Sequence, residues 1–195
     1  MGGVLSTRMN DEAVRLLGVL DGVGGIEPPG RLTAGLQERL ASGIVRRAQV
    51  LTWANSLGNA DGAPSFFPDL TGWECSDSSF HLEDEVPVAV TLTEDSEPRI
   101  SEAGQRVLLS HGIAFAMGFA RLVYALDPPG PVRCIIAANQ TNATFRFHQI
   151  RPGERWNLPD LDQFRLDKVI EVDTHPASRR LAPTPNPDST SPQAT

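Results

Sequence analysis

The stretch SEAGQRVLLSHGIAFAMGFARLVYAL, from Ser101 to Leu126, is the most apolar part of the 195-residue chain. Its uncharged part, residues 107–120, is short, and Arg121 follows where a membrane span would still need apolar side chains. An uncharged run of roughly 10–14 residues favours a buried core helix over a membrane span. We therefore expect the central helix of a soluble core here, and no membrane span.

The residues after this helix predict strands. Val132–Ala137 and Thr144–Ile150 are expected to pair in an antiparallel manner around an Asn/Thr turn. The sequence KVIEV, at 168–172, predicts another strand, and LPDLDQFRLD, at 158–167, predicts a helical turn.

Before the helix, three short strands are expected at GWECS (72–76), SFHLE (79–83) and VPVAVTL (86–92). Val86, Val88 and Val90 alternate with other residues as in a half-buried strand. Pro87 has no backbone N–H, so it indicates an edge strand.

Two helices are expected near the N-terminus. One runs from about Asn10 to Leu20, with Asn10 as its cap, and the other from about Leu32 to Leu57, with a possible break at Gly43. The predicted fold is α+β and single-domain, with N-terminal helices and a mostly antiparallel sheet packed on the central apolar helix. Its parts are an N-terminal helix and Gly/Pro linker (1–30), a core (31–174) and a disordered Pro/Ser/Thr-rich tail (175–195).

Composition limits the classes of protein. Hydrophobic residues make up 40% and charged residues 21% of the chain, as in a globular protein that needs no metal or disulfide. A net charge of −7 argues against nucleic-acid binding. Cys75 and Cys134 are expected to be reduced, in the cytoplasm. The N-terminal MGGVLS matches the N-myristoylation pattern, which leaves lipidation open.

The charge is unevenly distributed. Residues 59–98 contain ten acidic residues and no Lys or Arg, so the rest of the chain carries +3. Carboxylates with scattered aromatic side chains could dock onto a basic protein partner, because complementary charge speeds encounter and aromatic anchors supply affinity. The predicted partner-binding acidic surface consists of Trp73, Asp77, Phe80, Glu83, Asp84 and Glu85.

The stretch NQTNATFRFHQIRPGERW, from Asn139 to Trp156, predicts a second contact region. In a strand, Phe145 and Phe147 share the core face, whereas Arg146 and His148 share the exposed face. Charge-assisted hydrogen bonds from this region could bind an anion or an acidic partner surface. The residues expected to do so are Arg146, His148, Arg151 and Arg155.

Catalytic and metal-binding signals are weak. His81 and Glu83 supply two metal ligands with confidence, whereas a site needs three or four. No metal or cofactor is expected, and the chain has no nucleophile-elbow or phosphate-loop motif. Cys134 could meet His148 across a hairpin, but a buried thiol is usually inert.

These patterns predict a non-catalytic protein-binding module that uses the acidic surface at 59–98. The most specific version of this prediction is an immunity-type inhibitor of a basic toxin or nuclease. A small cytosolic enzyme that uses His148 or His81 with nearby acidic residues is one alternative, and a secretion chaperone or adaptor is another. The oligomeric state and the identity of the partner stay open.

Overall fold

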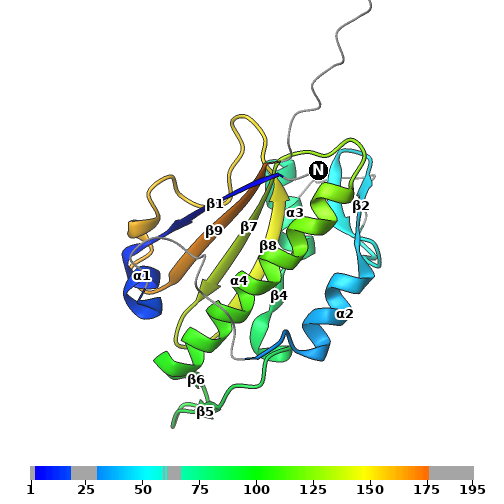
Figure 1. Cartoon of the computed structure of the whole chain (residues 1–195). Helices are drawn as coiled ribbons and strands as arrows, with labels where there is room; N and C mark the ends of the chain where they lie inside the picture. Colours follow the sequence, from blue (N-terminus) through cyan, green and yellow to red (C-terminus); the bar gives the residue numbers. More distant parts are fainter. Residues whose placement is uncertain (1–2, 19–29, 59, 61–66, 176–195) are drawn as a thin grey trace, which may run out of the picture.

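The computed structural model describes residues 3–18, 30–58, 60 and 67–175. A five-stranded antiparallel sheet in the order β1-β9-β7-β8-β4 forms its centre, and helix α4 crosses one face of that sheet (Figure 1). The expected α+β fold, a mostly antiparallel sheet packed on a central apolar helix, is therefore confirmed. The strands of this sheet are β1 (Val4–Met9), β4 (Phe80–His81), β7 (Val132–Ala138), β8 (Ala143–Gln149) and β9 (Lys168–His175).

Helix α4 (Glu102–Ala125) confirms the central helix predicted from the apolar stretch. Ser101 caps it, since its side chain accepts a hydrogen bond from the Gly104 N–H. Within the described ranges, α4 is the one helix long and apolar enough to cross a membrane, by length and composition only. Most of its apolar window, 61%, is buried inside the fold, as in the core helix of a soluble protein.

The core between α4 and the sheet is aromatic. Phe145 and Phe147 of β8 are fully buried, as the strand alternation predicts. The ring centroids of Phe115 and Phe145 lie 4.7 Å apart, and those of Phe119 and Phe147 lie 4.6 Å apart. Gly112 lets α4 approach the sheet closely, because a Cβ there would lie 2.7 Å from Cγ2 of Ile136.

The predicted pair of strands around the Asn/Thr turn is confirmed as β7 and β8, with Cys134 opposite Phe147 and Ile136 opposite Phe145. The side chain of Asn139 stabilises the turn, since its Oδ1 accepts the Thr141 N–H at 2.8 Å and the Asn142 N–H at 3.0 Å. Strand β9 pairs with the other edge of β7 and includes the predicted KVIEV strand. The helical turn expected at 158–167 is η3 (Leu161–Gln163), a 3-10 turn.

The long helix expected from Leu32 to Leu57 is wrong. Helix α2 (Ala34–Ser42) ends at Gly43, whose φ of 74° lies in the left-handed region that favours glycine. A hairpin of β2 (Ile44–Arg47) and β3 (Val50–Trp53) follows. The apolar spacing fits both structures, and the β-branched residues after Gly43 favour the strands.

Of the three strands expected before α4, the one at 79–83 is present in part as β4, the one at 86–92 only at its end as β5 (Val90–Leu92), and the one at 72–76 is wrong. Residues 72–76 belong to helix α3 (Leu70–Ser78), because Asp69 caps its start by accepting the Gly72 N–H at 2.7 Å. The valine alternation also fails, since Pro87 lies in no strand. The remaining elements of this region are η2 (Leu82–Asp84) and β6 (Pro98–Ile100).

At the N-terminus, helix α1 (Asp11–Leu17) confirms the Asn10 cap, whose Oδ1 accepts the Ala13 N–H at 3.0 Å. Strand β1 is missing from the sequence prediction. It pairs along β9, so the core begins near residue 4 and not at 31. The Pro-Pro turn at 28–29 and the tail from 176 lie outside the described residues.

Candidate functional site

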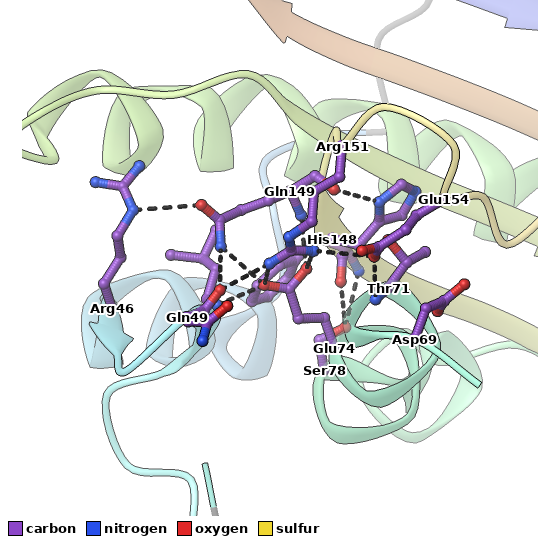
Figure 2. A network of polar contacts seen from close by, with 12 residues as sticks. Arg46, Gln49, Asp69, Thr71, Glu74, Ser78, His148, Gln149, Arg151 and Glu154 are labelled. Atoms are coloured by element: carbon purple, nitrogen blue, oxygen red, sulfur yellow. Dashed lines mark hydrogen bonds and ion pairs between the residues drawn. The ribbon is translucent and has the colours of Figure 1, made fainter. Parts of the chain in front are cut away.

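A buried carboxylate organises the polar network in Figure 2. Glu74 of α3 is fully buried. Its Oε1 accepts the Leu51 N–H of β3 at 2.6 Å, and its Oε2 accepts the Gln149 N–H of β8 at 2.8 Å. Arg151 donates to both oxygens, at 2.7 and 2.8 Å. Because a buried charge is stable only when paired and hydrogen-bonded, this set of bonds ties β3, β8 and the chain after β8 to α3.

Helix α3 also takes the place of a neighbouring strand along β8. Strand β4 pairs only Phe80 and His81 with Phe145 and Thr144. Beyond these pairs, the Ser78 hydroxyl donates to the Phe147 carbonyl at 2.9 Å and accepts the Phe147 N–H at 2.8 Å. Together with Glu74, Ser78 satisfies backbone groups that a free sheet edge would expose.

Arg151 is therefore not available to an external anion, and its predicted role as an anion contact is wrong. Besides the bonds to Glu74, its Nη2 donates to the Gln49 carbonyl at 2.9 Å. Arg155, four residues further on, is exposed, and a contact role for it stays a prediction.

His148 is buried, with 2% of its surface exposed, so its predicted place on an exposed face is wrong. Its Nδ1 lies 2.8 Å from the Gln149 carbonyl, and its Nε2 has no hydrogen-bond partner among the described residues. Burial lowers its pKa. It is also not opposite Cys134: His148 pairs with Arg133, and Cys134 faces the α4 side of the sheet. Both Cys75 and Cys134 are free and buried.

Two buried histidines predict a pH-dependent stability. Burial lowers the pKa of His111 as well as that of His148, so the unfolded chain takes up protons at a higher pH than the native chain. Their contribution is complete above the ordinary histidine pKa of about 6.5. It falls as the pH drops below that value, by at most about 1.4 kcal/mol per pH unit for each histidine.

Urea unfolding of the wild type and of the double variant His111→Gln/His148→Gln, from about pH 7 to 5.5, measures this effect. The wild type should lose more stability than the variant across the range. Parallel pH profiles for the two proteins would show that these histidines do not titrate as inferred.

The sheet face opposite α4 carries paired charges and one unpaired charge. Arg133 contacts Asp173 at 2.7 Å and Glu171 at 2.9 Å. The hydrogen bond that Arg133 donates to Asp173 raises the pKa of Arg133. Arg146 lies two residues before His148 on the same face, and no carboxylate within the described ranges pairs with it. It is the partly buried cation of this face that lacks a counter-charge.

Arg146 lines a cavity of about 400 Å³, here called the β8 pocket. Its guanidinium lies 5.0 Å from the ring centroid of Trp156 and donates to the Thr144 hydroxyl at 3.2 Å. Burial lowers the pKa of Arg146, because a poorly solvated cation is less stable. The residues that line the β8 pocket are Ser79, His81, Ile135, Ala137, Asn142, Thr144, Arg146, Trp156, Asn157, Phe164, Asp167 and Val169.

His81 lies at the rim of the β8 pocket with half of its side chain exposed. Its Nδ1 is 3.0 Å from Oε1 of Glu83, and Oε2 of Glu83 accepts the Ala143 N–H at 2.9 Å. Glu83 therefore orients the imidazole. In the part of the chain that the structure describes, no group of three or more His, Cys, Asp or Glu side chains is arranged to hold a metal ion.

The predicted acidic surface is dispersed. Asp77 accepts hydrogen bonds from the hydroxyls of Thr52 and Ser56, and Glu85 pairs with Arg39 at 2.8 Å. Phe80 is 6% exposed and packs in the aromatic core, so its assignment to a partner-binding surface is wrong. Trp73 is half-buried, and Asp84 is exposed.

Sequence reasoning found part of the β8 pocket. Arg146 and His81 were both singled out, but as members of different sites. Trp156, Asn157 and Phe164 were missed as lining residues, because they come from an irregular segment whose path over the sheet has no sequence period. The Trp156 ring close to a run of arginines was the one available signal.

A family model described as the uncharacterized protein PM0498 family matches residues 29–182. Since this range is most of the chain, the chain belongs to that family. The match includes every residue that lines the β8 pocket. No curated protein and no solved structure matches the chain.

Proposed function

We propose that this protein is a binding protein whose β8 pocket takes the carboxylate of a ligand, with Arg146 as the anchor. The observation that carries the proposal is a partly buried guanidinium without a carboxylate partner in the described chain, at the wall of a cavity of about 400 Å³. Ligand pockets commonly have volumes of roughly 300–1,000 Å³ and a few convergent polar groups in an apolar lining. An anion would provide the counter-charge that the fold does not supply.

The pocket favours a carboxylate over a phosphate. Its lining has one arginine, and the planar guanidinium matches the two oxygens of a carboxylate. Asp167 also lines the pocket, Glu83 lies behind His81, and the lining has no lysine or second arginine to offset them, so a dianion would meet repulsion. Trp156 and Phe164, together with the aliphatic side chains of β7, provide an apolar wall. The ligand therefore combines one carboxylate with an apolar or aromatic body.

Substitution of Arg146 tests this proposal. Benzoate serves as the probe, with neutral benzamide as its isostere, and isothermal titration or NMR gives the affinities. Arg146→Gln should weaken benzoate binding about tenfold or more, the loss of a charge-assisted hydrogen bond. Arg121→Gln, at an exposed position of α4 that lines neither pocket, is the matched control and should bind as the wild type does. The proposal would be refuted if the wild type and Arg146→Gln bound benzoate with equal affinity. It would also be refuted if the wild type bound benzamide as strongly as benzoate.

The His81–Glu83 pair favours a second candidate function, proton transfer to or from the bound ligand. A carboxylate that orients an imidazole through Nδ1 leaves Nε2 to act as a base, which is a common catalytic arrangement. His148, the other histidine considered for this role, is enclosed in the fold. His81→Gln separates the two functions: a binding protein keeps its ligand and its biological effect, whereas an enzyme keeps the ligand and loses turnover.

The β5–β6 hairpin is an exposed acidic surface that could still bind a basic protein partner. The turn between β5 and β6 carries Glu94, Asp95 and Glu97, all exposed. Leu92, next to them, is 70% exposed. An inhibitor of a basic toxin, a chaperone or an adaptor would use this hairpin, and not the carboxylates of Asp77 and Glu85, which already have partners within the chain.

A further inference from the structure

A second cavity, of about 430 Å³, lies where the β7–β8 turn meets the start of β9. We call it the Lys168 pocket. It shares one lining residue, Asp167, with the β8 pocket, but its other residues differ. The lining consists of Asn139, Gln140, Thr141, Arg165, Leu166, Asp167 and Lys168.

Lys168 is the single lysine of the chain and is 9% exposed. Lysine is seldom buried to this degree unless its ammonium is paired. The Lys168 ammonium can donate three hydrogen bonds, but it makes no hydrogen bond and no ion pair with the described residues. The Nζ of Lys168 is not one of the fully buried polar atoms, so the buried part of the side chain is its aliphatic stem and the ammonium reaches the cavity. An anion in the cavity would supply a counter-charge that the described residues do not.

Polar side chains of the lining bond to one another. Oδ1 of Asp167 accepts the Asn139 amide at 2.8 Å. The Asn139 Oδ1 accepts the Thr141 hydroxyl at 2.7 Å. These bonds hold the turn together without Lys168.

A second cation lies on the rim. Arg165 is exposed, and its guanidinium has no carboxylate partner in the described ranges; its backbone N–H bonds only to the Gln163 carbonyl. A lysine ammonium and an arginine guanidinium that line the same cavity can together bind phosphoryl oxygens. This pocket therefore differs from the β8 pocket, which has one arginine and an aromatic wall.

We propose that the Lys168 pocket is a phosphoryl-binding site, with Lys168 as the inner anchor and Arg165 as the outer contact. The ligand class is a small phosphate or phosphate monoester. This site stands apart from the carboxylate-binding proposal, because no residue required for one anchors the other.

The single lysine makes the test direct. In protein labelled with ¹³Cε-lysine, Lys168 gives the only lysine resonance, and inorganic phosphate is added at constant ionic strength, with chloride as the control salt. The proposal predicts a saturable shift with phosphate and none with chloride. Arg165→Gln should weaken phosphate binding about tenfold. Lys168→Met, followed by ³¹P line width, should abolish it, while both variants bind benzoate as the wild type does.

A lysine resonance that does not move with phosphate, or moves equally with chloride, would overturn the assignment. Arg165→Gln lies on the surface and keeps the test valid if Lys168→Met fails to fold. Loss of benzoate binding in Arg146→Gln with phosphate binding retained would show that the two sites are independent. Phosphate affinity that falls in Arg146→Gln but not in Arg165→Gln would place the anion in the β8 pocket and contradict the inference.

Discussion

Glu74→Gln lowers the free energy of unfolding by about 3–5 kcal/mol, the cost of removing one partner of a buried ion pair. The side chain stays close to its original shape, but one carboxylate oxygen becomes an NH₂ group. That group faces donors, since Leu51 N–H, Gln149 N–H and Arg151 all donate to this carboxylate. Arg151, which is partly buried, keeps only its longer carboxylate contact with Glu154, at 3.8 Å.

Chemical denaturation at neutral pH measures this loss, and two variants calibrate it. Glu12→Gln breaks the exposed Glu12–Arg15 pair, 2.9 Å long, and should cost less than about 1 kcal/mol. The double variant Glu74→Gln/Arg151→Met removes both charges and should recover part of the stability. If Glu74→Gln were no more harmful than Glu12→Gln, the network could not be what holds α3 against β8.

Phe115→Ala should cost about 3–5 kcal/mol, the range found when a large buried aromatic side chain is removed. Phe115 is fully buried at the centre of the aromatic cluster. Its ring centroid is 4.7 Å from that of Phe145, 5.5 Å from that of Phe80 and 6.3 Å from that of Trp53. The other rings cannot fill the resulting cavity without leaving their own contacts.

Met117→Ala, on the same helix, is the matched control. Met117 is 45% exposed, so its loss should cost less than about 1 kcal/mol. Thermal or urea unfolding of the two variants gives the comparison. Similar stabilities would mean that α4 is not packed on the sheet through its Phe115 face, and the membrane alternative for this helix would return.

The helices and strands predicted correctly are those that depend on residues close together in the sequence. Helix α4 follows from its apolar run and its Ser101 cap, and β7 and β8 follow from alternation around a turn that Asn139 closes. Helix α1 follows from Asn10. Each of these signals lies within a few residues of the structure that it determines, so no tertiary contact is needed to interpret it.

The failures have tertiary causes. The apolar spacing of residues 32–57 fits a helix as well as a helix followed by a hairpin, and burial of all four residues of β3 favours the hairpin. Strand β1 is half-exposed at the sheet edge and has little apolar alternation, so only its pairing with β9 defines it.

The sequence also predicts the candidate site only in part. Strand alternation placed Arg146 opposite the phenylalanine face, which is correct. It could not show that Trp156, in the segment after β8, packs against the Arg146 guanidinium, or that His148 is buried. Nor could it show that Glu74, 77 residues away in sequence, binds Arg151. Of the two arginines that remain from the predicted cluster, Arg155 is exposed, and Arg146 is the partly buried one that lines the β8 pocket.

The NMR signal of the Arg146 guanidinium is the most direct measure of whether Arg146 anchors a carboxylate in the β8 pocket. Side-chain Nε–Hε NMR signals, assigned with Arg146→Gln and Arg151→Lys, report on single arginines while benzoate is added. If the Arg146 guanidinium binds a carboxylate, its signal should shift saturably with benzoate and stay unchanged with benzamide, and the Arg151 signal should stay in place because Glu74 already pairs with Arg151. An Arg146 signal that does not respond to benzoate, or that moves no more than the signals of exposed arginines, would show that Arg146 is not the carboxylate anchor.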